Sequence, residues 1–138
     1  MILTRKLSVL SEGGFYSANI TDRVRDVVKE SGIREGMALV FYQHTTGCVI
    51  IMEHEAGILV DLENMLEAIL PRTEDYKHHI RGYDTNGAAH IRSAVLGVSV
   101  DIPVVAGDLQ LGTYQEILVL DMDSARKERT ILIQVMGE

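Results

Sequence analysis

Apolar and polar residues alternate or form short apolar runs along most of this chain, a pattern typical of strands in a sheet with a buried face. Glycine-containing turns at residues 12–14 and 106–108 separate several of these stretches. Together the runs and turns predict strands over residues 2–10, 15–20, 37–42, 48–52, 98–104, 109–111, 115–121 and 130–136.

Three stretches follow helical spacing instead. Thr21 is placed to cap a helix over residues 22–31, and Gly32 suits its end. A longer helix is predicted over residues 56–70, ended by Pro71. Its repeat predicts one buried apolar face, made of Ile58, Leu59, Leu62, Met65, Leu66 and Ile69. A short third helix is predicted over residues 88–96. These elements predict an α+β fold: one compact domain over residues 1–138, mostly antiparallel sheet or sandwich packed with two or three helices.

Composition and charge exclude several classes of function. The net charge of −7 argues against non-specific binding of nucleic acid, which needs a basic surface. No apolar run approaches the ~20 residues that a membrane helix requires, so we expect no membrane partner. The single cysteine, Cys48, has no partner for an internal disulfide, which favours a reducing cytoplasm.

The most informative stretch is the end of the strand over residues 37–42, which runs into Gln43-His44-Thr45-Thr46-Gly47. A lone histidine is more often structural than a ligand, and no two histidines here have the spacing of a helical zinc motif. Position is the stronger argument. His44 ends a strand, His78 lies in the polar loop over residues 71–88, and His90 opens a helix. Three converging imidazoles would leave a fourth position open for water or substrate, as in a catalytic zinc site.

Two carboxylates follow in the same part of the chain. Glu53 and Asp61 are candidates to orient a histidine or to act as a general base. The alternative is that they are solvated acids, one before the start of the long helix and one on its flank.

A second set of polar residues is suited to anions. Arginine is a natural bidentate partner of phosphate, and hydroxyls, amides and glycine backbone can add hydrogen bonds. The candidates for binding a phosphorylated ligand are Thr45, Thr46, Arg92, Ser93, Thr113 and Gln115. Each alone is more often part of a turn or strand end. Residues 123–129 are interpreted as a solvated charged turn, although Arg126 or Arg129 could reach a site.

In their order and spacing, these residues resemble the YjbQ-like family, sometimes described as secondary thiamine-phosphate synthases. The resemblance covers essentially the whole chain. It is carried by Gln43-His44-Thr45-Thr46, Glu53, Asp61, Tyr76-Lys77-His78, His90-Ile91-Arg92-Ser93 with Leu96-Gly97, Pro103-Val104 and Gly112-Thr113-Tyr114-Gln115. Met52 and Tyr114 depart from the family pattern, which often has Asn and Trp at these places.

The resemblance implies a compact α+β fold that assembles as a homotrimer, with sites near subunit boundaries. It also implies that His44, His78 and His90 share one polar site and that His54 and His79 are surface residues. The activity attached to the family is thiamine-phosphate synthesis, a transfer that joins a pyrimidine diphosphate to a thiazole phosphate and releases diphosphate.

Three functions remain open from the sequence. The first is a metal-assisted enzyme that acts on a small phosphorylated metabolite, with thiamine-phosphate synthesis as its named version and His44 among the catalytic residues. Its metal would be zinc, which suits imidazole, or Mg²⁺, which prefers oxygen ligands and accompanies diphosphates. The second is a zinc-dependent hydrolase with Glu53 as base. The third is a non-catalytic protein that binds a small ligand.

Overall fold

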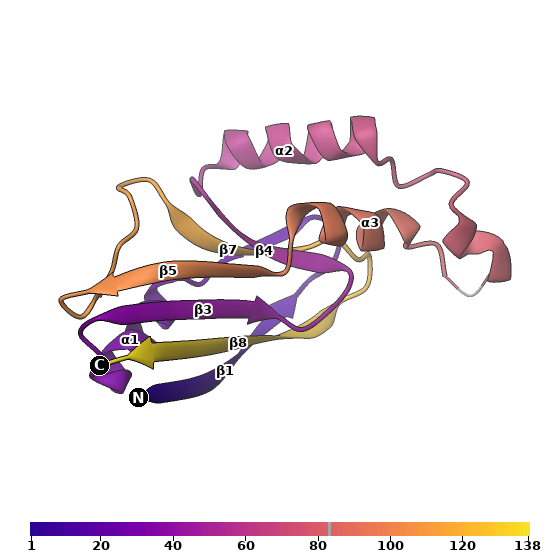
Figure 1. Ribbon diagram of the computed structural model, residues 1–138. Coiled ribbons are helices and arrows are strands. Elements are labelled where there is room, and N and C mark those ends of the chain that lie inside the picture. The colour runs from indigo at the N-terminus through magenta and orange to yellow at the C-terminus, as the bar shows by residue number, and fades with distance from the viewer. Residues whose placement is uncertain (83) are drawn as a thin grey trace.

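The strands form two antiparallel sheets that pack against each other (Figure 1). The computed structural model describes residues 1–82 and 84–138. In spatial order, the larger sheet contains β1 (Ile2–Ser11), β8 (Lys127–Gly137), β3 (Gly36–Tyr42), β5 (Ser99–Val105) and β6 (Asp108–Leu109). The smaller sheet contains β2 (Tyr16–Asn19), β7 (Glu116–Asp121) and β4 (Gly47–Met52).

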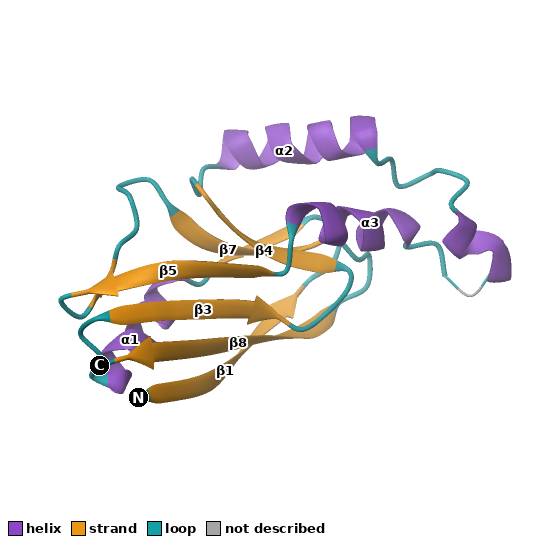
Figure 2. Cartoon of the chain, viewed as in Figure 1, coloured by secondary structure: helices purple, strands orange, loops and turns teal. Residues whose placement is uncertain are grey.

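The helices occupy two different places around these sheets (Figure 2). The apolar side of α1 (Thr21–Ser31) joins the core between the sheets, through Val24, Val27 and Val28. Side chains of α2 (Ala56–Ile69) and α3 (Gly87–Leu96) pack on the outer face of the smaller sheet. A short 3₁₀ helix, η1 (Lys77–Arg81), lies between them in the chain. The predicted α+β class and its antiparallel sheets are confirmed.

Successive side chains of β7 alternate between two hydrophobic cores, one on each face of the smaller sheet. Ile117 and Val119 point into the core between the sheets, whereas Leu118 and Leu120 point outward toward α2 and α3. Successive side chains of a strand face opposite sides, so a strand covered on both faces must be apolar at nearly every position. β7 is therefore buried along almost its whole length.

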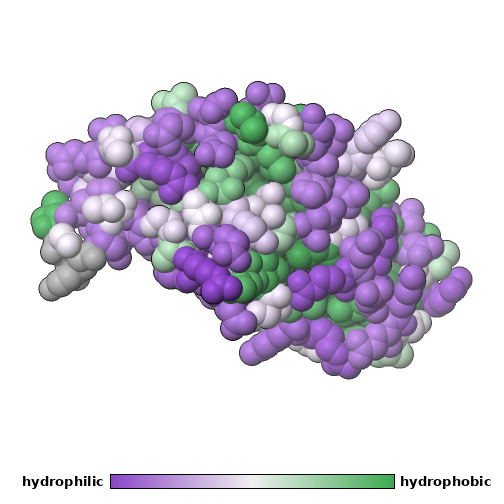
Figure 3. All heavy atoms as spheres, turned by 180° about the vertical axis from the view of Figure 1, so that it is seen from behind, coloured by the Kyte–Doolittle hydropathy of each residue, from purple (hydrophilic) through white to green (hydrophobic). Residues whose placement is uncertain are grey.

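The long helix α2 does not bury the face that its sequence predicts. Leu66 is its only fully buried residue, and Leu59 and Leu62 are partly covered. Ile58, Met65 and Ile69 were also predicted to be buried, but they are exposed, as is Val60 on the same helix. The contact between α2 and the sheet is narrower than the apolar stripe of this helix, so part of the stripe stays exposed. Seen from behind, apolar side chains lie among polar ones along the upper edge, where α2 runs (Figure 3).

The predicted cap of α1 is also wrong. Ile20 occupies the cap position, and no side chain caps the first turn. Thr21 Oγ1 instead donates to Asn19 Oδ1 at 2.7 Å and accepts from the amide of Ile117 at 2.8 Å. The hydroxyl therefore ties the start of α1 to the neighbouring strand β7. The predicted end is confirmed, since Gly32 takes the left-handed conformation, with φ of 69°.

None of the helices in the described part of the chain combines the length and apolar character needed to cross a membrane.

Candidate functional site

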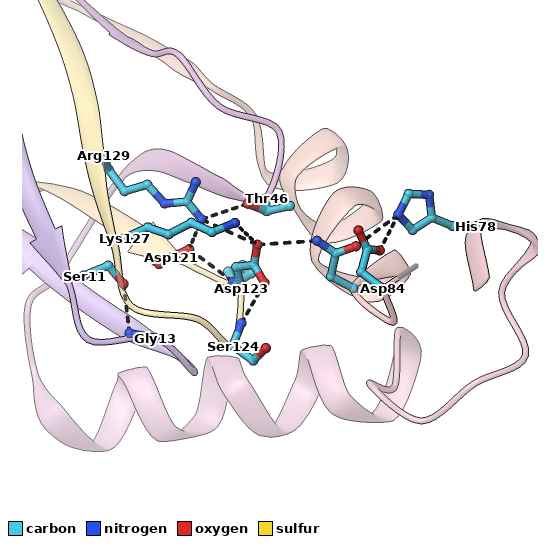
Figure 4. A network of polar contacts seen from close by, with 12 residues as sticks. Ser11, Gly13, Thr46, His78, Asp84, Asp121, Asp123, Ser124, Lys127 and Arg129 are labelled. Carbon is cyan, nitrogen blue, oxygen red and sulfur yellow. Dashed lines mark hydrogen bonds and ion pairs between the residues drawn. The ribbon is translucent and has the colours of Figure 1, made fainter. Parts of the chain in front are cut away.

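The core between the sheets ends in a buried ion pair. The inward positions of β8 are Ile131, Ile133 and Val135, and the same period of two places Arg129 inward as well. The same period along β7 puts Asp121 on the inner face. Arg129 Nη2 donates to Asp121 Oδ1 at 2.7 Å, and both side chains are almost completely buried (Figure 4).

Arg129 also connects this ion pair to the segment that follows β3. Its Nη2 donates to the hydroxyl of Thr46 at 2.8 Å, and its guanidinium carbon lies 6.0 Å from the centre of the Tyr42 ring. Within the described residues, Arg129 Nε, Asp121 Oδ2 and the Tyr42 hydroxyl have no hydrogen-bond partner. The cluster is thus a buried polar group whose hydrogen-bonding capacity is only partly used.

A second, less buried ion pair adjoins the first one. Lys127 Nζ lies 3.0 Å from Asp123 Oδ2 (Figure 4). Asn86 donates to the same oxygen at 3.4 Å. Burial by itself would raise the pKa of Asp123. The hydrogen bonds from Lys127, the backbone of Ser124 and Asn86 together lower that pKa below its usual value. Asp123 is therefore held as a carboxylate.

His44 is placed by the strand next to its own. The amide of Thr130 on β8 donates to His44 Nε2 at 2.8 Å, and the amide of Gln43 donates to the carbonyl of Thr130 at 3.2 Å. The imidazole stands edge-on to the Tyr42 ring, with 5.2 Å between ring centres. Partial burial, Arg129 and Lys127 lower the pKa of His44, so the neutral ring is favoured at pH 7.

The other two predicted histidines lie side by side. The rings of His78 and His90 are 4.7 Å apart between centres and meet edge to face. His78 Nε2 is 2.9 Å from Asp84 Oδ1 and 3.0 Å from Asn86 Oδ1. Both neighbours accept hydrogen bonds, so this nitrogen carries a proton. Asn86 thereby joins His78 to Asp123.

These groups border two adjoining clefts. Both clefts are lined by Gln43, His44, Thr45 and His90. The larger one has a volume of about 550 Å³, and it is completed mainly by apolar groups and Ser93. The second has a volume of about 430 Å³ and is lined mainly by polar side chains, including Thr46, Asp84, Asn86, Asp123, Lys127 and Arg129. A ligand with an apolar part and an anionic part could span the two.

Arg92, a predicted phosphate ligand, has a different position. Its side chain is fully buried, and it donates twice to the carbonyl of Leu70, at 2.7 and 3.0 Å. It also contacts Glu67 at 2.9 Å. These bonds join α3 to the end of α2. Arg92 does not line either cleft, whereas its neighbour Ser93 lines the larger one.

Glu53 and Gln115, two further predicted residues, lie at the opposite end of the smaller sheet. Gly47 pairs with Asp121 and Met52 with Glu116, so β4 runs away from His44 toward residue 53. At about 3.3 Å per residue, Glu53 is roughly 20 Å from Thr46. The register also puts Gln115 near Glu53. Within one chain, the exposed residues Glu53, Asp61, Thr113 and Gln115 line neither cleft.

The arrangement of the histidines fits a metal only in part. Among residues 1–82 and 84–138, no three His, Cys, Asp or Glu side chains form a group that could hold a metal ion. His78 does have a carboxylate on its protonated nitrogen, the usual support of a metal-binding imidazole. His44 has a backbone donor at Nε2 instead. The set of His44, His78 and His90 as three ligands stays a prediction that this geometry does not favour.

The sequence interpretation missed most of the polar cluster beneath the clefts. Residues 123–129 were interpreted first as a solvated turn, but β8 already begins at Lys127, and Arg129 is buried. The alternative, that Arg129 could reach a site, agrees with its place in the lining of the polar cleft. One signal was present: Arg129 continues the alternation of Ile131, Ile133 and Val135. Asp121 likewise continues the inward positions of β7. A charged residue at an inward position of each of two strands indicates a buried pair.

The whole chain is similar to one group of proteins in sequence and in fold. Residues 5–138 match the family model described as "UPF0047 protein YjbQ-like". A UPF0047 protein of Methanothermobacter thermautotrophicus is 35% identical over 99% of this chain and 94% of its own length. One from Archaeoglobus fulgidus is 40% identical over 83% of this chain and 86% of its own. A crystal structure described as a YbjQ-like protein of unknown function, from Sulfolobus solfataricus, has a TM-score of 0.94 at 31% identity, with 100% of this chain and 99% of that one covered.

Proposed function

This chain belongs to the UPF0047 YjbQ-like family, and we propose that it is an enzyme that acts on a small phosphorylated metabolite in the clefts beside His44. One observation carries the proposal. Two histidines from separate elements, His44 and His90, line the same polar cleft as the two cations Lys127 and Arg129 of β8. Hydroxyls of Thr45 and Thr46 line it as well. This combination of cations, imidazoles and hydroxyls suits a phosphate group.

The named version of the proposal is thiamine-phosphate synthesis. In that reaction the ring nitrogen of a thiazole phosphate forms a bond to the methylene carbon of a pyrimidine diphosphate. The bond from this carbon to the diphosphate oxygen breaks, and diphosphate leaves with the electron pair. The enzyme must stabilise the charge that develops on the leaving group. Lys127 can do so from the wall of the polar cleft, and Arg129 from beneath it, while the larger cleft would hold the organic ring.

A divalent metal is the second part of the proposal. His78 and His90 are the residues best placed to hold zinc, since their rings are adjacent and His78 is supported by Asp84. A metal there would supply positive charge for a departing phosphate or activate water. The second function, metal-dependent hydrolysis, rests on the same pair of rings.

We further propose that the chain acts as a homotrimer in the cytoplasm. The exposed apolar residues of α2 support the assembly, because a partner subunit would cover them. Assembly would also explain why Glu53, Thr113 and Gln115 lie far from His44 in one chain, since a neighbouring subunit could supply them. The reducing compartment is supported by the single cysteine, Cys48.

The proposal is tested by supplying the purified protein with the pyrimidine diphosphate, the thiazole phosphate and Mg²⁺, and measuring thiamine phosphate. We expect Lys127→Met and His90→Ala each to lower the rate at least tenfold. Lys29→Met is the matched control, because Lys29 is exposed on α1, outside both clefts. If the wild-type protein forms no product, thiamine-phosphate synthesis is wrong as its activity. If it also binds no diphosphate, the phosphorylated substrate class is wrong.

A further inference from the structure

The hydrogen bond between Thr130 and His44 determines where the proton of the imidazole lies. A backbone amide can only donate, so His44 Nε2, 2.8 Å from the Thr130 nitrogen, must present its lone pair. The proton of the neutral ring is then on Nδ1. A doubly protonated ring would place two N–H groups face to face, which this contact disfavours.

The surroundings of His44 favour the same neutral form. Arg129 and Lys127, both on β8, repel a second positive charge, and partial burial adds to this effect. Asp121 acts in the opposite direction, but its carboxylate is already paired with Arg129. Asp84 and Asp123 share the polar cleft with His44, but Asp84 is hydrogen-bonded to His78 and Asp123 is paired with Lys127. His44 is thus held neutral by contacts on the protein side of its ring.

The other nitrogen of the ring remains accessible. Within the described residues, His44 Nδ1 has no hydrogen-bond partner, and it is not among the buried atoms that lack one. Because His44 lines both clefts, a ligand bound there would lie beside this ring. We infer that His44 is a neutral hydrogen-bond donor that binds an oxygen atom of the ligand through Nδ1–H, and that it is not a metal ligand. The identity of the oxygen as part of a phosphate rests on the function proposed above.

A comparison with His78 shows why metal binding by His44 is disfavoured. A metal-binding imidazole usually donates its second N–H to a carboxylate or carbonyl. His78 has that arrangement, with Asp84 and Asn86 at Nε2. If His44 bound a metal through Nδ1, its Nε2 would have to carry a proton that faces the Thr130 amide. If it bound through Nε2, the bond to Thr130 would have to break.

The first test measures the tautomer directly by long-range ¹H–¹⁵N NMR of the whole protein labelled in its histidines. We expect the pattern of a ring protonated at Nδ1 for His44 at pH 7, and of one protonated at Nε2 for His78. Added zinc should shift the nitrogens of His78 or His90 and leave those of His44 as they were. Protonation of His44 at Nε2, or a zinc shift at its ring nitrogens, would overturn the inference.

The second test separates the two nitrogens by substitution. His44→Asn keeps a donor near the position of Nδ1, whereas His44→Gln keeps an acceptor that reaches the Thr130 amide. Calorimetry with inorganic diphosphate should show weaker binding by H44Q than by H44N, by about fivefold or more. In urea, H44Q should be the more stable of the two. The reverse order of affinities would contradict the donor role. Absence of diphosphate binding by the wild-type protein would contradict the proposed function instead, and the NMR result would still decide the tautomer.

Discussion

At the scale of single residues, the site depends on charged side chains at positions where the strand pattern calls for apolar ones. Arg129 and Asp121 occupy the last inward positions before the clefts, so the core ends in an ion pair. Burial of two charges is costly, and it is offset only while both partners are present and hydrogen-bonded. Arg129 holds Thr46 at the cleft by a hydrogen bond. The next residue of β8 is Thr130, whose amide donates to His44.

Arg129→Met should therefore be strongly destabilising, because it leaves the Asp121 carboxylate buried without its partner. We expect the free energy of unfolding to fall by about 3–5 kcal/mol in urea titrations. Arg5→Met is the matched control: Arg5 pairs with Glu30, but both side chains are about half exposed. Its cost should be about 0–1 kcal/mol. Equal losses from the two substitutions would show that the buried pair has no special role.

The neutral state of His44 predicts how stability depends on pH. The pKa of His44 is lowered in the folded protein from an unfolded value of 6.5. Below that value the unfolded chain binds more protons than the folded one, so stability is complete above pH 6.5 and falls as the pH drops through the folded pKa. Urea unfolding between pH 7.5 and pH 5 should show a larger loss for the wild type than for H44Q, whose side chain does not titrate. Parallel curves for the two proteins would mean that His44 titrates normally.

At the scale of elements, α3 is the piece that joins the site to the outer layer. The side chains of His90 and Ser93 on α3 line the larger cleft. Arg92 on the same helix donates to the carbonyl of Leu70 at the end of α2. The predicted role of Arg92 in phosphate binding came from its neighbours in the sequence. On a helix, however, adjacent residues face different directions. His90 and Ser93, three positions apart, share a face, and Arg92 points away from it.

Arg92→Met should consequently loosen α2 without affecting the clefts. Loss of the bonds to the Leu70 carbonyl should cost about 1–3 kcal/mol of stability. Amide exchange of residues 66–72 should accelerate. Arg25→Met is the control, since Arg25 forms a solvent-exposed pair with Asp22 on α1. Diphosphate affinity should stay within twofold of the wild type; a tenfold loss would return Arg92 to the binding site.

At the scale of the whole molecule, the apolar surface of α2 is the main feature that one chain leaves without cover. Met65 and Ile69, one turn apart on the same face of α2, are 47% and 66% exposed, although the helix has a strongly apolar sequence. Contiguous apolar surface of this kind on a small protein usually marks an interaction site. A second and third copy of the chain are the occupants that the proposed trimer requires.

Light scattering after size exclusion should give the mass of three chains for the wild type. Met65→Lys and Ile69→Lys should shift the mass toward one chain, because a charge would be buried in the interface. Ile2→Lys is the matched control, since Ile2 is equally exposed on the distant strand β1. A wild-type protein that runs as a single chain would refute the trimer.

Much of the fold could be predicted from the chain, because local patterns carry it. Strands and helices were found within a few residues, and glycine marked the end of α1 as predicted. The boundary of β8 was placed too late, because charged residues at its start were assigned to a turn. The burial of α2 was overestimated for a related reason: an apolar stripe predicts that a helix face will be covered, but it does not say by which chain.

The candidate site, like the fold, could be predicted only in part. The residues around His44 were predicted to face one site, and Thr45, His90 and Ser93 do line clefts with it. The amino-acid sequence alone determined the elements and the type of side chain at each of their ends, because hydrophobic period and turn chemistry are local. Only the tertiary structure decided which ends meet. The packing of the two sheets brings Asp121 to Arg129, and the pairing of β3 with β8 places the Thr130 amide against His44. The register of β4 and β7 leaves Glu53 and Gln115 at the other end of the smaller sheet.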